Sequence, residues 1–346
     1  MIHSNHISTK WRPFPALFAC LAATVLSFVP SFAASLLEPR YDTVLMAAMD
    51  QTFRMNYAAA ESSLAQLPAD HAAHPYFTGL SCLNRFKDLG DTAALRHAEI
   101  FWNRLSPRNA SSERFREDSV SLRLYRGMAA LQLSYIASLR GFTLRSASLA
   151  LTARGQLLPV TGQAEADAGL ALFDYYREHA LEKIRFLPFV NPNTNVPLKQ
   201  LKSAANQSRY LRDGLLVSAF WIHVDRKETD SALKIADDFL GRYPHNRLAR
   251  QMRGSALFRG GRLTEARLVY EELLREYSAL KDSLPSSYLP IGYYCSVANL
   301  ARIYWGLGLS SQAKVKLEEW RKVRNSSLES WLPSSLKKDL EHLEVH

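Results

Sequence analysis

The sequence predicts an all-α fold of stacked, antiparallel helix pairs. Two contiguous windows, residues 213–246 and 247–280, are each 34 residues long, and each contains an apolar helix, a polar turn and a second amphipathic helix. That length is typical of helix-turn-helix repeats. A third window, residues 294–327, follows the same pattern. Strands are not predicted, because alternating apolar and polar runs are short and glycine–asparagine hairpin signals are absent.

Small residues in the second window show how two helices can pack closely. Gly254 and Ala266 lie on facing helices, where a side chain larger than a methyl group would push the pair apart. Leu257, Tyr270 and Leu273 have the helical spacing that places them on one apolar stripe. The third window supplies an equivalent set, which is Leu300, Ala301, Tyr304, Gly308, Ala313, Leu317 and Trp320.

These residues resemble the tetratricopeptide repeat (TPR) family over residues 213–327, and RGSALFRGGRLTEARLVYEELL is the most family-like segment. Phe220 and His223 depart from the family, which prefers a small residue and a tyrosine there. Because His223 lies on an apolar stripe, we expect it to be a core histidine. The resemblance implies a right-handed α-solenoid, in which the first helix of each repeat lines a concave groove.

Carrying the family's groove positions onto this sequence gives a set of candidate binding residues. They are Val217, Trp221 and Asp225 from the first window, Gln251, Ser255, Phe258 and Arg259 from the second, and Arg302 and Trp305 from the third. Aromatic and arginine side chains in a groove would suit an extended peptide or a partner helix. The alternative is that Trp221, Phe258 and Trp305 pack between neighbouring repeats.

The chain divides into four parts. They are an export signal at 1–33, degenerate helical repeats at 34–186, a proline- and asparagine-rich loop at 187–198, and the TPR-like repeats with a charged capping helix at 199–346. In the second and third parts and just beyond them, helices are predicted at 43–56, 58–67, 75–87, 92–105, 119–139, 142–158, 163–186 and 199–207. Gly79, Gly127 and Gly169 are expected at close helix contacts. We expect one elongated domain, because repeats add length without adding separate cores.

Residues 1–33 have the pattern of an export signal. Lys10 and Arg12 precede an apolar run at 14–29, and Ser31-Phe32-Ala33 offers the small residues that a signal peptidase reads. We therefore expect cleavage and a location in the periplasm of a Gram-negative bacterium. The alternatives are a membrane anchor formed by residues 14–32, or a lipid attached at Cys20.

Positive charge is concentrated in residues 104–154, which hold nine arginines, no lysine and three acidic residues, in a chain whose net charge is +10. The candidate basic patch consists of Arg114, Arg116, Arg123, Arg126, Arg140, Arg145 and Arg154. Anionic lipid headgroups, cell-wall polymers or an acidic protein surface would suit such a patch. Nucleic acid is not expected as a partner of an exported protein. The alternative is a solvated charged face.

Catalytic and metal-binding patterns are not found in the sequence. It has no GxxxxGK phosphate loop and no Gly-x-Ser-x-Gly elbow. His71 and His74 are three residues apart, but the helix-borne glutamate of a zinc motif is missing. Cys82 and Cys295 lie in apolar helical patterns and in opposite halves of the array, so we expect two buried thiols and no disulfide. No cofactor is predicted.

The sequence therefore predicts a non-catalytic scaffold of the cell envelope, which binds a peptide or a partner protein in the groove of the solenoid. An enzyme that processes cell-wall glycan is the first alternative, and it would need paired carboxylates or a nucleophile facing one cleft. An adaptor that uses residues 104–154 to bind an anionic membrane surface is the second.

Overall fold

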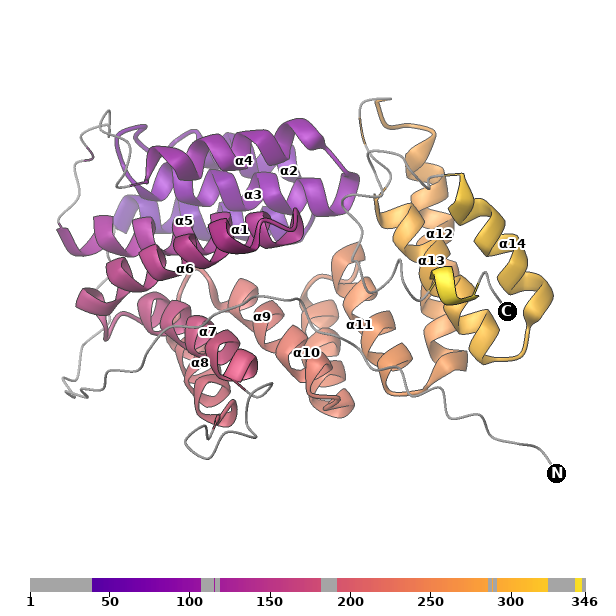
Figure 1. Cartoon of the computed structure of the whole chain (residues 1–346). Coiled ribbons are helices and arrows are strands. Elements are labelled where there is room, and N and C mark those ends of the chain that lie inside the picture. Colours follow the sequence, from indigo (N-terminus) through magenta and orange to yellow (C-terminus); the bar gives the residue numbers. More distant parts are fainter. Residues whose placement is uncertain are drawn as a thin grey trace.

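The computed structural model describes residues 39–106, 115, 119–181, 192–285, 288, 291–322 and 340–343. The regular elements of these residues are all helices (Figure 1). In order they are α1 (Pro39–Phe53), α2 (Tyr57–Leu64), α3 (Ala73–Leu89), α4 (Thr92–Arg104), α5 (Ser119–Leu139), α6 (Thr143–Leu157), the 3₁₀ turn η1 (Leu158–Val160), α7 (Ala164–Leu181), α8 (Asn195–Gln207), α9 (Arg212–Asp225), α10 (Thr229–Arg242), α11 (Arg247–Arg259), α12 (Leu263–Lys281), α13 (Ile291–Gly306) and α14 (Ser310–Arg321).

Helices that follow one another in the chain pack as pairs, from α1 with α2 to α13 with α14. Odd-numbered helices also contact one another along the array. The contacting pairs are α1 with α3, α3 with α5, α5 with α7, and α9 with α11. We call the odd-numbered helices the inner helices. This is the TPR-like arrangement that the sequence predicts, and the predicted all-α solenoid is confirmed. The windows 213–246, 247–280 and 294–327 correspond to α9–α10, α11–α12 and α13–α14.

Short polar side chains and a glycine set the helix ends. Gly90, with φ of 73°, ends α3 in the left-handed conformation that glycine adopts most easily. Asp91 then begins α4, because its carboxylate accepts hydrogen bonds from the backbone N–H groups of Ala93 and Ala94. Asn246 caps α11 in the same way, through the N–H of Ala249. The sequence predicts a loop at residues 187–198, but α8 already begins at Asn195, within that range. Residues 182–191 lie outside the described part of the chain.

Glycines predicted at close helix contacts do face large side chains. A Cβ added to Gly79 would lie 2.4 Å from Nε1 of Trp102, which is fully buried on α4. At Gly254 the nearest atom of Tyr270 would be 2.8 Å away. Both distances are too short for real contacts, so each glycine allows an inner helix to approach the next helix of the array.

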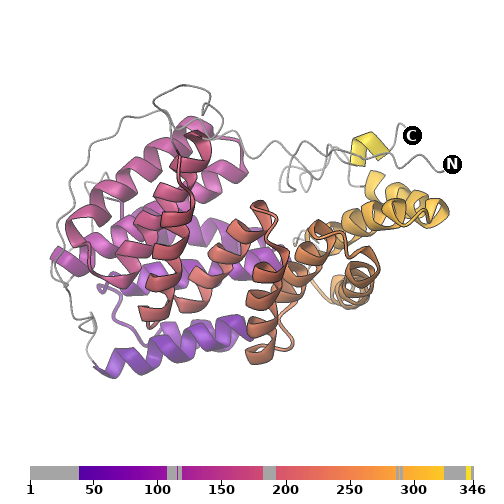
Figure 2. The same cartoon turned by 90° about the horizontal axis from the view of Figure 1, so that it is seen from below.

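The array curves back on itself, and the prediction of an elongated stack is wrong in this respect. The inner helix α3 contacts α11 and α13, so the indigo N-terminal helices lie beside the orange helices in both views (Figures 1 and 2). The side-chain amide of Asn246 donates to the carbonyl of Phe53 at 2.6 Å. The Phe53 ring packs against Phe239 and Tyr243, with centroid distances of 5.4 and 5.6 Å.

A buried charge lies at the centre of this closure. The side chain of Asp88, at the end of α3, is 0% exposed and receives two hydrogen bonds from Arg247, from Nε at 2.8 Å and from Nη2 at 2.5 Å. The Tyr57 hydroxyl donates to Asp88 at 3.2 Å, and the Tyr277 hydroxyl donates at 3.5 Å. We call Tyr57, Asp88, Arg247 and Tyr277 the Asp88 clasp. It joins α2, α3, α11 and α12.

The curvature also changes the expected position of the cysteines. Cys82 and Cys295 were expected in distant parts of the array, but their helices, α3 and α13, are in contact. Both thiols are free. Burial raises the pKa of each to about 12, so both are protonated and unreactive at neutral pH.

Breaking the Asp88 clasp should destabilise the protein strongly. We expect Asp88→Asn to lower the free energy of unfolding by about 3–5 kcal/mol, because Arg247 would remain charged and buried without its counter-ion. Urea unfolding followed by circular dichroism measures this. The control is Glu265→Gln, which breaks an exposed ion pair with Arg262 at 2.6 Å and should leave the urea midpoint almost unchanged. Equal midpoints for the two variants would contradict the structural role of the clasp.

A methyl group added at a close helix contact should also destabilise the protein. Gly79→Ala forces Trp102 to move and should cost about 1–3 kcal/mol of unfolding free energy. The matched control is Gly155→Ala on α6, where nothing lies within 4 Å of the added Cβ. Since alanine favours helix, this variant should gain up to about 1 kcal/mol. Thermal unfolding of the two variants checks that the shifts have opposite signs.

Candidate binding surface on the inner helices

Three exposed aromatic side chains lie on successive inner helices. Tyr135 is on α5, Tyr176 is on α7 and Trp221 is on α9, and each exposes between 41% and 54% of its surface. We call these three residues the aromatic row. Lys87, at the end of α3, lies over the Tyr135 ring at 4.7 Å from its centroid and extends the row toward the Asp88 clasp. Exposed tyrosine and tryptophan are common at binding surfaces, because their large rings lose little conformational entropy on contact.

The pKa of Tyr176 reports on the groups around the middle of the aromatic row. Burial among neighbouring groups is the main reason that the pKa of Tyr176 rises to about 12, although 54% of the residue is exposed. Tyr135 and Asp225 add to this rise through their charges, which places both groups near the Tyr176 hydroxyl. Asp225 and Trp221 are four residues apart on α9 and therefore share one face of the helix. The row thus continues from α5 through α7 to α9.

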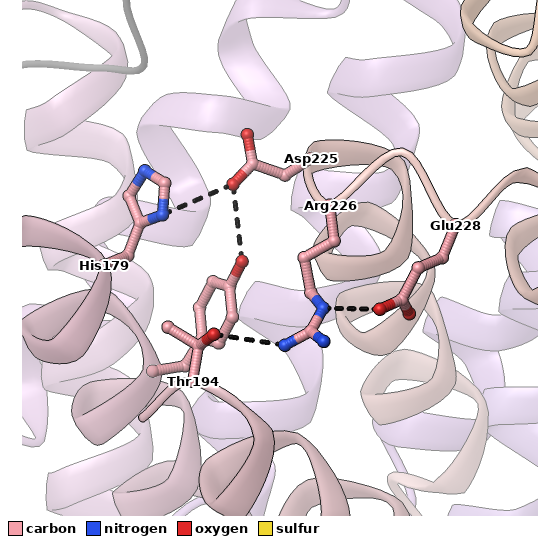
Figure 3. Close-up of a pocket in the computed structure, with 6 residues that line it drawn as sticks. His179, Thr194, Asp225, Arg226 and Glu228 are labelled. Carbon is pink, nitrogen blue, oxygen red and sulfur yellow. Dashed lines mark hydrogen bonds and ion pairs between the residues drawn. The ribbon is translucent and has the colours of Figure 1, made fainter. Parts of the chain in front are cut away.

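A polar pocket of about 310 Å³ adjoins the row where the end of α7, the start of α8 and the end of α9 meet (Figure 3). Its lining residues are Tyr175, His179, Thr194, Asp225, Arg226 and Glu228. The Tyr175 hydroxyl donates to Oδ2 of Asp225 at 3.3 Å, and Nδ1 of His179 lies 3.6 Å from the same oxygen. Asp225 therefore lies between two side chains of α7.

Positive charge in the pocket is already neutralised. Arg226 donates from Nε to Glu228 at 2.7 Å, from Nη1 to Thr194 at 3.1 Å and from Nη2 to Asn195 at 2.5 Å. In Figure 3 Arg226 points toward Thr194 and Glu228, whereas Asp225 faces His179. The Asp225 carboxylate, whose side chain is 44% exposed, is therefore the charge that the pocket presents to a ligand. A positively charged group would be attracted there.

His223 lies behind this pocket and is the core histidine that the sequence predicts. It is 2% exposed, and its Nδ1 lies 2.5 Å from Oε2 of Glu228. Burial lowers the pKa of His223 below its usual value, against the opposing effect of Glu228, and the charges of Lys202 and Arg226 lower it further. The ring is therefore neutral at pH 7. Glu228 is bound through both oxygens, by Arg226 and by His223, and its pKa is lowered.

The structure places the groove residues taken from the TPR resemblance in two groups. Trp221, Asp225 and Arg259 are exposed. The others are half-buried and take part in helix packing, as is clearest for Gln251, which donates to Tyr277 at 3.3 Å, and Ser255, which is 2.9 Å from the Tyr270 hydroxyl. The half-buried set is Val217, Gln251, Ser255, Phe258, Arg302 and Trp305, and Arg302 lies over the Phe258 ring at 4.3 Å. Tyr135 and Tyr176 are additional candidates that the sequence did not identify.

Five of the seven candidate basic residues lie in the described part of the chain. Arg114 and Arg116 lie outside the described residues. On α5, Arg123 is exposed and Arg126 is half-buried. Arg140, which directly follows this helix, makes two hydrogen bonds to Glu99 at 2.6 and 2.8 Å. On α6, Arg145 is exposed, and Arg154 lies 5.8 Å from the centre of the Phe173 ring.

Two further properties concern only the described part of the chain. No group of three or more histidine, cysteine, aspartate or glutamate side chains there is arranged to hold a metal ion. Among the described helices, none is both long and apolar enough to cross a bilayer.

Comparisons with known proteins give no family assignment. No protein-family model matches the sequence, and no curated protein matches it. Among solved structures, the chain is similar to a monomeric mutant of IFIT1 with Gppp-AAAA, at a TM-score of 0.33 and 13% sequence identity. That alignment covers 88% of this chain and 77% of the other. A similarity this weak supports no conclusion about function.

The neutral state of His223 predicts acid sensitivity. Because its pKa is lower in the folded protein than the unfolded value of about 6.5, its contribution to stability is complete above pH 6.5 and is lost as pH falls below that. We expect urea midpoints to fall between pH 7.5 and 5.5, and to fall less in His223→Gln. The control His97→Gln replaces an exposed side chain and should keep the full decrease. Identical pH profiles for wild type and His223→Gln would contradict this assignment.

Proposed function

We propose that the protein is a non-catalytic scaffold that binds an extended segment of a partner protein along the aromatic row. The observation that carries this proposal is the exposure of Tyr135, Tyr176 and Trp221 on the inner helices α5, α7 and α9, with Asp225 one helical turn from Trp221. Exposed rings on adjacent helices give a long, shallow surface, and such surfaces fit extended peptides better than compact small molecules.

The negative charge of the pocket indicates which side chains the partner's segment should carry. Asp225 is the available carboxylate, and the Trp221 ring lies one helical turn away on the same face of α9. A lysine or arginine side chain of the partner would form an ion pair with Asp225 and a cation–π contact with Trp221. Apolar or aromatic side chains of the same segment would pack on Tyr135 and Tyr176. The favoured ligand is therefore an extended peptide with a basic residue among apolar ones.

A glycan-processing enzyme is less well supported by the same pocket. Such enzymes commonly use two facing carboxylates, one of which must be protonated to act as an acid. Asp225 and Glu228 both line the pocket, but Glu228 is bound by Arg226 and His223 and its pKa is lowered. A carboxylate held ionised in this way cannot donate a proton. The arrangement suits charge recognition and not acid catalysis.

The proposed location is the bacterial cell envelope, after export directed by residues 1–33. The support for export is the pattern of that segment, in which two basic residues precede an apolar run and a small-residue cleavage site. The partner would then be an envelope protein with an accessible, extended segment.

Site-specific photocrosslinking in the native host tests the proposal. A photoreactive phenylalanine analogue placed at Tyr176 or Trp221 should crosslink a partner protein. The same analogue at Leu268 on α12 or Val315 on α14, which are equally exposed on the other layer of helices, should not. Crosslinks to the same proteins from all four positions, or none from the aromatic row, would contradict the proposal.

Purified components then measure the contribution of the row. We expect Tyr176→Ala/Trp221→Ala to weaken binding of the crosslinked segment at least about thirtyfold, because buried aromatic residues are often worth about 2 kcal/mol or more each. Leu268→Ala/Val315→Ala is the matched control and should bind as the wild type does. Isothermal titration calorimetry gives both values, and circular dichroism confirms that each variant is folded.

A further inference from the structure

The helix α6 and the turn that follows it carry exposed apolar side chains. Leu144 is 84% exposed, and Leu151 and Leu158 are each about half exposed. Leu144 and Leu151, seven residues apart, lie on one side of α6, and Leu158 begins the 3₁₀ turn η1 directly after this helix. Phe142, which precedes the first turn, adds another exposed ring. We call Leu144, Leu151 and Leu158 the α6 leucine stripe. The opposite side of α6 is buried against α5 and α7.

Positive charge flanks the stripe on both sides. At 100° per residue, Arg145 lies about 100° to one side of Leu144 and Arg154 about 80° to the other. No aspartate or glutamate occurs between residues 119 and 164, although the whole chain has 33 acidic residues. The side of α6 that carries the leucines is therefore flanked by Arg145 on one edge and by Arg154 on the other, where Arg154 also interacts with the Asp174 carboxylate of α7.

This pattern argues against a second copy of the chain as the occupant of the stripe. A symmetric dimer would place the same face of α6 against itself, and it would bring the two copies of Arg145 toward each other with no acidic residue of α6 to separate them. Three leucines also provide much less area than the roughly 800 Å² that each partner buries in a stable protein interface. An anionic bilayer removes both difficulties, because it supplies the opposite charge and needs no matching surface.

We propose that α6 docks the protein on an anionic lipid bilayer. The leucines would enter the boundary between headgroups and acyl chains, and Arg145 and Arg154 would bind the phosphates of the headgroups. The protein would lie on the surface without crossing it. Since α6 belongs to the even-numbered helices, the aromatic row on α5, α7 and α9 would stay open to a partner. The inference does not depend on the proposed function.

Vesicle sedimentation of the full chain tests the proposal. The chain should bind vesicles of phosphatidylglycerol and phosphatidylcholine, and binding should weaken severalfold when NaCl rises from about 50 to 500 mM, because salt screens the arginines. We expect Leu144→Ser/Leu151→Ser to lower the partition coefficient at least about tenfold. The control Leu268→Ser/Val315→Ser removes two other exposed apolar residues, on α12 and α14, and should bind as the wild type does.

A local probe separates α6 from the apolar run at residues 14–29, which has its own affinity for lipid. In a Cys20→Ser background, Leu151→Cys carries an environment-sensitive NBD label, and Leu268→Cys carries it as the control. Cys82 is buried and Cys295 is partly buried, and both have pKa values of about 12, so neither should be labelled. The label at position 151 should shift its emission to the blue with anionic vesicles, and the label at position 268 should not.

Four results would overturn the proposal. They are no blue shift at position 151, equal binding to vesicles of phosphatidylcholine alone, equal losses in the α6 variant and its control, and a dimer that dissociates in Leu144→Ser/Leu151→Ser without any loss of lipid binding. The last result, seen by light scattering after gel filtration, would assign the stripe to a second copy of the chain.

Discussion

The ion pair between Asp88 and Arg247 is the constraint on which the shape of the array depends. Repeat arrays are usually held together by contacts between neighbouring repeats alone, so their ends do not meet. Here the two partners are 159 residues apart, and the carboxylate is fully buried. A buried charge without its partner costs several kcal/mol, so α3 and α11 cannot separate unless water reaches both groups. Tyr57 and Tyr277 complete the hydrogen bonding of the carboxylate.

This closure determines which inner helices remain accessible. It involves α3, α11 and α13, whose contacts join the two ends of the array. Gln251 belongs to the same network, since it donates to Tyr277 and Tyr277 donates to Asp88. The helices between these ends, α5, α7 and α9, keep the exposed rings of the aromatic row. A partner segment would therefore meet the middle of the array, whereas the resemblance to TPR proteins implied a groove centred on its C-terminal repeats.

Local patterns in the sequence predicted the helices and their pairing, because those features depend on neighbours in the chain. Gly79 and Gly254 at close helix contacts are examples, and so is His223 on an apolar stripe. The clasp had no such signal, because an aspartate near the end of a helix is usually solvated and nothing local indicates a partner 159 residues away. Tyr135 and Tyr176 were missed since the degenerate repeats of residues 34–186 gave no register that marks their inner positions.

The two proposed surfaces differ in charge, and this difference favours different ligands. With a net charge of +10, the chain as a whole attracts anions. Arg145 and Arg154 beside the α6 leucine stripe have the same sign as this long-range field, so electrostatic attraction would both steer and hold an anionic bilayer. The Asp225 carboxylate in the pocket is negative, whereas the net charge of the chain is positive. The positive charge of Arg226 in the same pocket is neutralised by Glu228. A cationic side chain would therefore be recognised there through short-range contacts with Asp225 and Trp221, at distances where nearby charges outweigh a screened net charge.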